Sequence, residues 1–194
     1  MNPGVLFDAV ISDRAVPVDP SIPLLVWWAH RLAELGLTPC YGPGDHGNLS
    51  CRGERTVLIS ARETAKATLQ PSDVVEILGV EEADDVWTIR CRGLRLPSTD
   101  TRLHLHVYAV RPDVRAIIHG HDPQTLAHVK ALRLPMTASS AAVPSRELIQ
   151  NVCDLIQQDD YLLLRDHGFL AVGRTLDEAG ERVRLLCSRA RALG

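Results

Sequence analysis

Two histidines separated by one glycine constrain this chain more than any other feature. His119-Gly120-His121 ends an apolar segment that begins at Arg115, and Asp122-Pro123 follows immediately. The apolar segment predicts a buried strand, on which residues i and i+2 project from the same face. Asp followed by Pro is typical of a helix start. We therefore expect the two imidazoles side by side, where a central strand gives way to a helix.

The His-x-His pair suggests a metal site. Two neutral imidazoles at this spacing can chelate a divalent first-row metal, although buried histidines hydrogen-bonded to the backbone are an open alternative. His167 follows the apolar segment Tyr161–Leu164 and precedes Gly168, so we expect it at a strand end, where it could supply a third ligand. Three protein ligands leave one coordination position open, which is typical of a catalytic site.

A carboxylate near a predicted helix start is the candidate acid or base. The segment Pro97-Ser98-Thr99-Asp100 precedes apolar residues that recur at helical spacing. Ser98 or Thr99 could cap this helix, and Asp100 lies where a helix N-terminus stabilises negative charge. Asp100 could be a general acid or base, a displaceable fourth metal ligand, or only a helix-terminal charge.

The rest of the chain intermixes helical and strand patterns. Residues 1–20 hold several prolines and no clear period, so we expect an arm before one domain over residues 21–194. Periodicity predicts helices near 21–36, 145–157 and 175–193, and strands at 48–52, 55–60, 73–78, 86–92, 161–166 and 169–172. The acidic stretch 79–85 is expected to be a turn. Hairpins mixed with crossovers indicate an α/β or α+β layered domain.

Composition excludes several functional classes. Hydrophobic residues make up 45% of the 194 residues, the formal net charge is −3, and no basic stripe appears, so nucleic-acid binding has no support. No apolar run is long enough to span a membrane, and the first residues lack a secretory signal. Five widely spaced cysteines without a C-x-x-C fit reduced thiols in a cytoplasm. We expect a cytoplasmic protein with a small-molecule substrate.

The motifs, taken in order, resemble the class II aldolase/adducin family, whose best known enzymes are fuculose-1-phosphate aldolase and ribulose-5-phosphate 4-epimerase. Gly47-Asn48-Leu49-Ser50 resembles the family's G-N-x-S, and Pro97-Ser98-Thr99-Asp100 resembles its P-S-S-E. Arg111-Pro112-Asp113 with His119-Gly120-His121 is similar to its R-P-D…H-x-H block, and Asp166-His167-Gly168 to its H-H-G-type segment. The ordered set is specific and covers residues 24 to 190.

The resemblance implies a three-layer α/β/α fold with a mixed, largely antiparallel central sheet, assembled into tetramers. It implies that His119, His121 and His167 hold one divalent metal per chain, first of all Zn²⁺, although Mn²⁺, Fe²⁺ and Co²⁺ also suit three imidazoles. Asp100 takes the position of the catalytic carboxylate. An anion such as phosphate would lie against Gly47, Asn48, Ser98 and Thr99. Ser60 and Arg62 are further candidates for binding this anion.

Departures from the family pattern bear on this site. Asp100 stands where the aldolases have Glu, which is one methylene longer. Arg62-Glu63 stands where the family has a small hydroxyl residue and Gly; Arg62 could grip an anion bidentately, whereas Glu63 would repel one. Two more histidines are candidates: His46 for a substrate contact, and His104, one turn after Asp100, for a hydrogen bond behind the site.

We predict from these features a metal-dependent lyase of the aldolase type. It would cleave or form a carbon–carbon bond in a small sugar-like substrate, with or without a phosphate, through a metal-stabilised enediolate. Asp100 would carry the proton to or from the reacting carbon. The alternatives are a dehydratase, epimerase or decarboxylase with the same metal site, or a non-catalytic adducin-like assembly domain. Retention of all three histidines argues against the last alternative.

Overall fold

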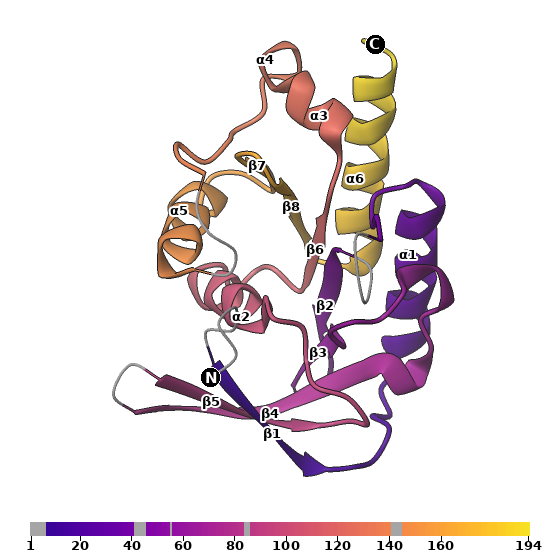
Figure 1. Ribbon diagram of the computed structural model, residues 1–194, viewed down its shortest axis with the longest axis vertical. Helices are drawn as coiled ribbons and strands as arrows, with labels where there is room; N and C mark the ends of the chain where they lie inside the picture. The colour runs from indigo at the N-terminus through magenta and orange to yellow at the C-terminus, as the bar shows by residue number, and fades with distance from the viewer. Residues whose placement is uncertain (1–6, 41–45, 55, 84–85, 141–144) are drawn as a thin grey trace.

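A computed structural model places one mixed β-sheet between two layers of helices (Figure 1). It describes residues 7–40, 46–54, 56–83, 86–140 and 145–194. The strands are β1 (Phe7–Asp13), β2 (Asn48–Arg52), β3 (Val57–Ser60), β4 (Val74–Ala83), β5 (Val86–Arg92), β6 (Ala116–Gly120), β7 (Tyr161–Leu164) and β8 (Gly168–Gly173). Their order across the sheet is β1-β5-β4-β3-β2-β6-β8-β7. Only β1 and β5 pair in parallel among these strands, which confirms a mixed, largely antiparallel sheet.

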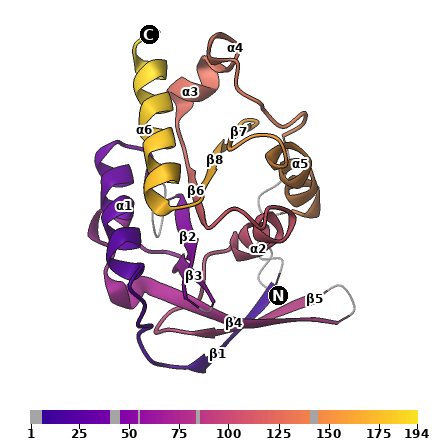
Figure 2. The same ribbon diagram turned by 180° about the vertical axis from the view of Figure 1, so that it is seen from behind.

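Helices cover both faces of the sheet (Figures 1 and 2). They are α1 (Ile22–Glu34), α2 (Thr101–Val110), α3 (Pro123–Ala127), α4 (Val129–Leu132), α5 (Arg146–Ile156) and α6 (Leu176–Arg191). Helices α1 and α6 pack on one face, and α2 and α5 pack on the other. The arrangement confirms the three-layer α/β/α fold. None of the helices in the described ranges is long and apolar enough to cross a bilayer.

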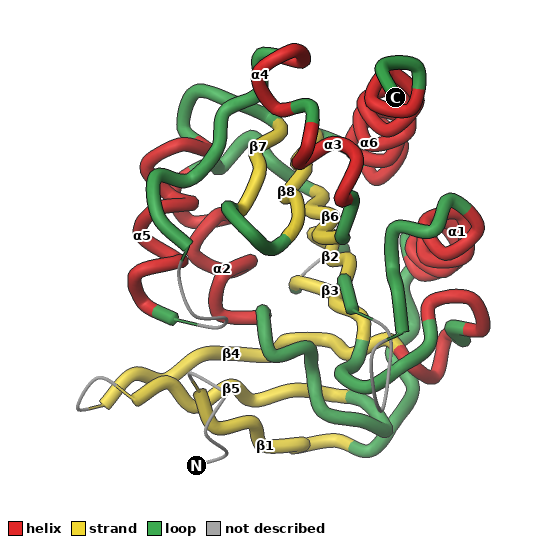
Figure 3. The backbone as a smooth tube through the Cα atoms, turned by 45° about the horizontal axis from the view of Figure 1, so that its top comes forward, coloured by secondary structure: helices red, strands yellow, loops and turns green. Residues whose placement is uncertain are grey.

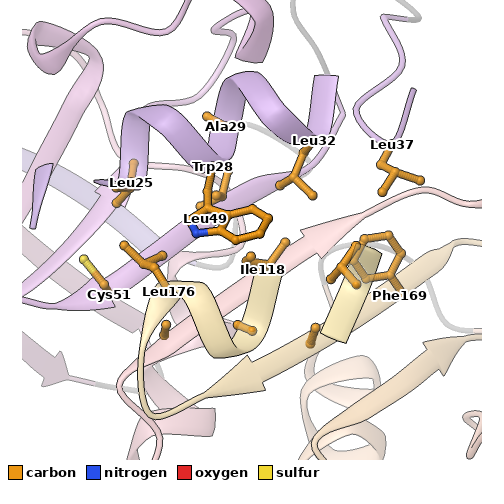
Figure 4. Close-up of a cluster of buried hydrophobic side chains, with 14 of the residues drawn as sticks. Leu25, Trp28, Ala29, Leu32, Leu37, Leu49, Cys51, Ile118, Phe169 and Leu176 are labelled. Atoms are coloured by element: carbon orange, nitrogen blue, oxygen red, sulfur yellow. The ribbon is translucent and has the colours of Figure 1, made fainter. Parts of the chain in front are cut away.

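Trp28 anchors the core between α1, α6 and the sheet (Figure 4). Its indole Nε1 donates a 2.8 Å hydrogen bond to Asp177 Oδ1, and it packs so closely on Gly180 that a Cβ there would lie 2.4 Å from the ring. Trp28 is only 1% exposed, whereas Trp27 is 51% exposed. The adjacent tryptophans therefore have different roles, because one faces α6 and the other faces solvent.

Polar side chains at three predicted helix starts cap their helices. The Asp122 carboxylate accepts from the backbone N–H groups of Gln124 and Thr125 at the start of α3. Ser145 and Thr175 cap α5 and α6 in the same way. Helix α2 differs, because its N-cap is Asp100, with no side-chain capping bond, rather than Ser98 or Thr99. The Asp100 carboxylate is engaged elsewhere, as described below.

Two segments that were predicted to be irregular are strands. Residues 79–83 continue β4 instead of turning, because their acidic side chains point to solvent on a hairpin with β5, where Glu81 pairs with Arg90. Residues 7–13, inside the predicted arm, form β1; residues 1–6 lie outside the described part of the chain. Alternate side chains of β1, beginning with the buried Phe7, face the core. Figure 3 shows β1, β4 and β5 side by side at one edge of the sheet.

Several strand ends meet at one end of the sheet. Strands β2 and β8 begin there, and β3, β6 and β7 end there. Asn48, the first residue of β2, lies directly opposite His119 near the end of β6. Ile117, also on β6, packs against α2 and α5. His119 is two residues further along the strand, so its side chain projects from the same face of the sheet as Ile117. Asn48 and His119, two of the candidate site residues, therefore lie together at this end of the sheet.

Candidate metal and active site

Three histidines converge at this end of the sheet. His119 comes from β6, His121 from the residue after Gly120, and His167 from the turn between β7 and β8. The ring centroids are 5.2 Å apart for His119 and His121, 4.8 Å for His119 and His167, and 4.7 Å for His121 and His167. One nitrogen from each lies within 4.8 Å of the other two. These are the three histidines expected from the sequence.

A backbone contact fixes the orientation of His119. Its Nδ1 lies 2.8 Å from the carbonyl oxygen of Phe169. Because a carbonyl can only accept, Nδ1 carries the proton and Nε2 keeps its lone pair. A second nitrogen held by a carbonyl is the usual support of a metal-binding imidazole.

The environment keeps these rings neutral. Burial, followed by the proximity of His167, lowers the pKa of His119 to about 3. Burial and then the neighbouring His119 and His167 lower the pKa of His121 to about 3. Burial also lowers the pKa of His167. Only a neutral imidazole offers a lone pair to a metal, so all three are in the ligand form at neutral pH.

Unsatisfied ring nitrogens indicate that the cluster fits a cation. His121 Nε2 and His167 Nδ1 are buried and have no hydrogen-bond partner among the described residues. Buried polar atoms without partners are rare and call for an explanation. A divalent transition metal satisfies several imidazole lone pairs at once, and the donor set suits Zn²⁺. The residues therefore fit the metal that the family resemblance implies.

Glycines allow the three histidines to approach one another. A Cβ on Gly168 would lie 2.3 Å from the carbonyl oxygen of Gly120, and a Cβ on Gly120 would lie 2.7 Å from the Phe169 ring. Gly47 has a φ of +99°, and a Cβ there would lie 2.9 Å from the His119 carbonyl oxygen. Any side chain at these positions would push the strands apart.

Asp100 lies beside the histidine cluster. Its Oδ2 accepts a 2.6 Å hydrogen bond from Asn48 Nδ2, and both residues are buried. The carboxylate is near enough to His121 and His167 to raise their pKa values, against the larger effect of burial. The structure thus brings together the carboxylate, the first residue of the G-N-x-S strand and the three histidines.

The candidate anion-binding residues lie around the turn before α2. Ser98 N donates to the Ser60 carbonyl oxygen at 3.2 Å, and Ser98 Oγ accepts from Asp100 N at 3.3 Å. Arg62 Nε donates to the Pro97 carbonyl oxygen at 3.1 Å, which holds the guanidinium beside this turn. Thr99 is half-buried, and Ser60 is fully buried with its hydroxyl accepting from Leu49 N.

Four contacts between β2 and α2 were not predicted from the sequence. Ser50 Oγ lies 2.7 Å from His104 Nδ1 and 2.8 Å from the Tyr108 hydroxyl. Arg52 stacks over the Tyr108 ring at 4.7 Å and donates to its carbonyl oxygen. The signal was present as spacing, because Asn48, Ser50 and Arg52 alternate on β2 while residues 100, 104 and 108 recur on α2.

One further histidine adjoins the cluster. The exposed ring of His46 packs edge-on against His121, with centroids 5.2 Å apart. That separation equals the one between His119 and His121. His46 therefore lies at an exposed edge of the cluster, beside His121.

Comparison with known proteins gives this geometry a context. The sequence profile of the Class II Aldolase and Adducin N-terminal domain matches residues 24–193. The 5-methylthioribulose-1-phosphate/5-deoxyribulose-1-phosphate aldolase of Rhodospirillum rubrum is 30% identical over 167 residues, covering 78% of this chain and 70% of that protein. Human beta-adducin is 36% identical over 153 residues, which are 70% of this chain but only 19% of that protein.

A solved structure supports the fold. The sugar-phosphate aldolase of Thermotoga maritima superposes with a TM-score of 0.73, covering 89% of this chain and 93% of that chain. At 20% identity, this likeness concerns the architecture alone. The same layers and sheet therefore occur in a protein of the same size class.

Proposed function

Since this chain belongs to the class II aldolase and adducin family, we propose that it is a metal-dependent lyase that cleaves or forms a carbon–carbon bond in a small sugar phosphate. The convergence of His119, His121 and His167 beside a buried carboxylate carries the proposal. An assembly domain has no need of three neutral imidazoles around one point, whereas a catalytic site with an open position does.

The metal would be held by His119, His121 and His167. When bound, a divalent cation supplies Lewis-acid polarisation of a substrate oxygen. Zn²⁺ is our first choice, because three neutral imidazoles with an open position are a common catalytic zinc site; Mn²⁺, Fe²⁺ and Co²⁺ suit the same donors. Gly120 and Gly168 keep the site compact, and the Phe169 carbonyl holds His119 in the tautomer that presents Nε2.

Asp100 is the proposed proton carrier. In aldol cleavage the departing aldehyde leaves its bonding electrons on the remaining fragment, and the Asp100 carboxyl would deliver a proton to that carbon; in synthesis the carboxylate would remove it. Asn48 Nδ2 holds Oδ2 at 2.6 Å and so limits the positions that the carboxylate can take. Asn48 Oδ1 is buried without a partner among the described residues, so it can accept from a substrate hydroxyl.

The substrate is proposed to carry a phosphate. The R. rubrum relative is named for ketose 1-phosphates, and the turn before α2 offers suitable groups in this chain. Ser98 and Thr99 lie beside the N-terminus of a ten-residue helix, where anions are favoured. Arg62 is held at Pro97 by Nε, which leaves its two Nη groups to face an anion, while Glu63 is exposed.

A substrate screen tests the proposal. The Zn²⁺-loaded protein would be incubated with five- and six-carbon ketose 1-phosphates and with carboxylated sugars, and products would be followed by mass spectrometry and NMR. An aldolase releases an aldehyde and a smaller ketone phosphate. Loss of water, inversion of one carbon or release of CO₂ would instead identify a dehydratase, epimerase or decarboxylase. The His119→Ala variant serves as the control for metal-dependent turnover.

Metal analysis separates the enzyme from an adducin-like assembly domain. A purified enzyme should hold about one divalent metal per chain, because three ligands converge on a single site. A chain that binds no metal and turns over no sugar phosphate would support the assembly role. The similarity to beta-adducin covers only a fifth of that protein, so it says little about such a role here.

Assembly and location complete the proposal. We expect a homo-oligomer, and the family resemblance implies a tetramer. The half-exposed Trp27 on α1 offers a contact between subunits. A monomer in sedimentation analysis at micromolar concentration would contradict the expected oligomer.

A cytoplasmic location is supported by the buried thiols of Cys51, Cys91, Cys153 and Cys187, which suit a reducing compartment.

A further inference from the structure

Two arginines meet at the end of β2 that lies away from the histidine cluster. The pairing of β2 with β6 runs as far as Cys51 and Ala116, and the next residues along are Arg52 and Arg115. Arg52 N donates a 2.8 Å hydrogen bond to the Arg115 carbonyl oxygen, so the two residues lie side by side. Arg52 and Asn48 are at opposite ends of β2, about 13 Å apart along the strand. The pair of arginines is therefore remote from the proposed metal site.

Both arginines line one cavity. It has a volume of about 410 Å³, which is in the size range of sites for small molecules. Thr56 also lines it, and its apolar wall consists of Val57, Ile77 and Leu105. Across the sheet, Arg52 pairs with Val57, and Val57 pairs with Ile77. The cavity therefore places two positive charges beside an apolar surface.

The fold holds the guanidinium of Arg52 in one place. Its Nε donates to the Val114 carbonyl oxygen at 3.0 Å, and its Nη2 donates to the Tyr108 carbonyl oxygen at 2.7 Å. The guanidinium also stacks over the Tyr108 ring, 4.7 Å from its centroid. These contacts leave the N–H groups of Nη1 without a partner among the described residues. A guanidinium that is already fixed loses little conformational freedom when it binds a ligand.

Arg115 adds a second positive charge beside the first. Its side chain is exposed, and its Nη2 donates to the Arg52 carbonyl oxygen at 3.4 Å. Elsewhere in the protein, Arg92, Arg111 and Arg182 each contact two carboxylates. Neither Arg52 nor Arg115 forms an ion pair with a carboxylate of the described ranges. Like charges on neighbouring strands repel, and an anion between them would remove the repulsion.

We propose that Arg52 and Arg115 bind the phosphate group of a small phosphate ester, at a second site apart from the metal. A phosphate monoester carries a charge of about −1.5 to −2 at neutral pH, which balances two guanidiniums better than a carboxylate does. Glu54, the acidic residue among the described lining residues, is exposed and forms an ion pair with neither arginine. The apolar wall contacts the rest of the ligand. This site shares no residue with the histidine cluster, so it does not depend on the proposed function.

An NMR titration with phenyl phosphate tests this site in the ¹⁵N-labelled, Zn²⁺-loaded full chain. Binding should shift the backbone amide signals of Gly53, Thr56 and Gly79, which line the cavity. The amide signals of Gly47 and Thr99 report binding at the proposed active site in the same samples. Benzoate has the same ring but a carboxylate, so it should bind the cavity more weakly. Unchanged cavity signals at low millimolar phenyl phosphate, or equal affinity for benzoate, would overturn the proposal.

Two variants of the exposed Arg115 separate binding from folding. Arg115→Ala should weaken phenyl phosphate binding at the cavity about tenfold, because it removes a hydrogen bond between charged groups. Arg189→Ala, at an exposed position on α6, is the control and should leave the affinity unchanged. Arg115→Glu places a carboxylate beside Arg52, so binding should be lost while the urea concentration at the unfolding midpoint stays at or above that of the wild type. Wild-type affinity in Arg115→Ala would remove Arg115 from the site. A lower midpoint in Arg115→Glu would show that the two guanidiniums do not repel, which would also overturn the proposal.

Discussion

Asn48 and Asp100, which lie 52 positions apart in the sequence, are joined by a 2.6 Å hydrogen bond between Nδ2 and Oδ2. The bond links the first residue of β2 to the N-cap of α2. It also explains why the Asp100 carboxylate does not cap its own helix. The carboxylate is instead held against the end of β2, where the residue opposite Asn48 is His119.

Replacing Asp100 should separate metal binding from turnover. Asp100→Asn can still accept from Asn48 and leaves the three histidines intact, so we expect full metal content and a loss of kcat on the order of 10²–10⁴-fold. Asp100→Glu should also lower kcat if the hydrogen bond to Asn48 defines the required length. Higher activity in Asp100→Glu would show that the site favours the longer side chain. Near-normal turnover in Asp100→Asn would point to another proton carrier, first of all His46, since Tyr108 is buried behind Ser50.

Each of the three clustered histidines should be required for tight metal binding. His119→Ala, His121→Ala and His167→Ala each remove one of the three converging ligands, so tight Zn²⁺ binding should be lost while the fold persists. Metal content after dialysis, together with circular dichroism, measures both. His128→Ala, after α3, is the matched control and should keep its metal. Full occupancy in one of the three variants would remove that residue from the ligand set.

Metal binding should release few protons near neutral pH. Burial lowers the pKa values of His119 and His121 to about 3, so the folded chain presents both rings unprotonated well below the ordinary histidine range of about 6.5. A proton therefore competes with the metal only as the pH falls toward those low values. Isothermal titration in two buffers of different ionisation enthalpy, at pH 7 and pH 6, should give similar affinities and little proton release. Release of one or more protons per metal at pH 7 would contradict this.

Arg62 should matter for anion affinity more than for chemistry. Arg62→Ala removes the guanidinium beside the turn before α2 but leaves Asp100 and the histidines in place. We expect KM for a ketose 1-phosphate to rise about tenfold with a smaller change in kcat, because a charge-assisted contact contributes about 1.5–3 kcal/mol and Arg62 is partly exposed. Arg189→Ala, at an exposed position on α6, is the control. Inorganic phosphate should inhibit the wild type better than Arg62→Ala, and equal inhibition would remove Arg62 from the anion site.

Gly168 should tolerate no side chain. A Cβ there would lie 2.3 Å from the Gly120 carbonyl oxygen, which is backbone and cannot move without shifting β6 from β8. Gly168→Ala should lower the free energy of unfolding by about 1–3 kcal/mol and weaken metal binding as the strands separate. Urea unfolding with and without Zn²⁺ measures both effects. Gly36→Ala is the comparison: Gly36 has a φ of +73° but nothing lies within 4 Å of a Cβ there, so it reports backbone strain without a steric clash.

The sequence by itself determined the features that depend on near neighbours. Residues i and i+2 of a strand share a face, so His119 and His121 were expected together, and the structure places their rings 5.2 Å apart. The caps at Asp122, Ser145 and Thr175 follow from hydrogen bonds that reach only two or three residues along the chain. Local patterns placed His167 at a strand end and Asp100 at a helix start, and the family resemblance added that both share one site with His119 and His121.

Only the tertiary structure decided the features that depend on packing between distant segments. Strand register, not local sequence, sets Asn48 opposite His119, and the crossing of α2 over β2 brings Ser50 to His104. Contact with α6 buries Trp28 and leaves Trp27 exposed, although the two have identical side chains. Pairing with a neighbouring strand likewise makes residues 7–13 and 79–83 extended, because backbone hydrogen bonds to a partner outweigh weak local preferences.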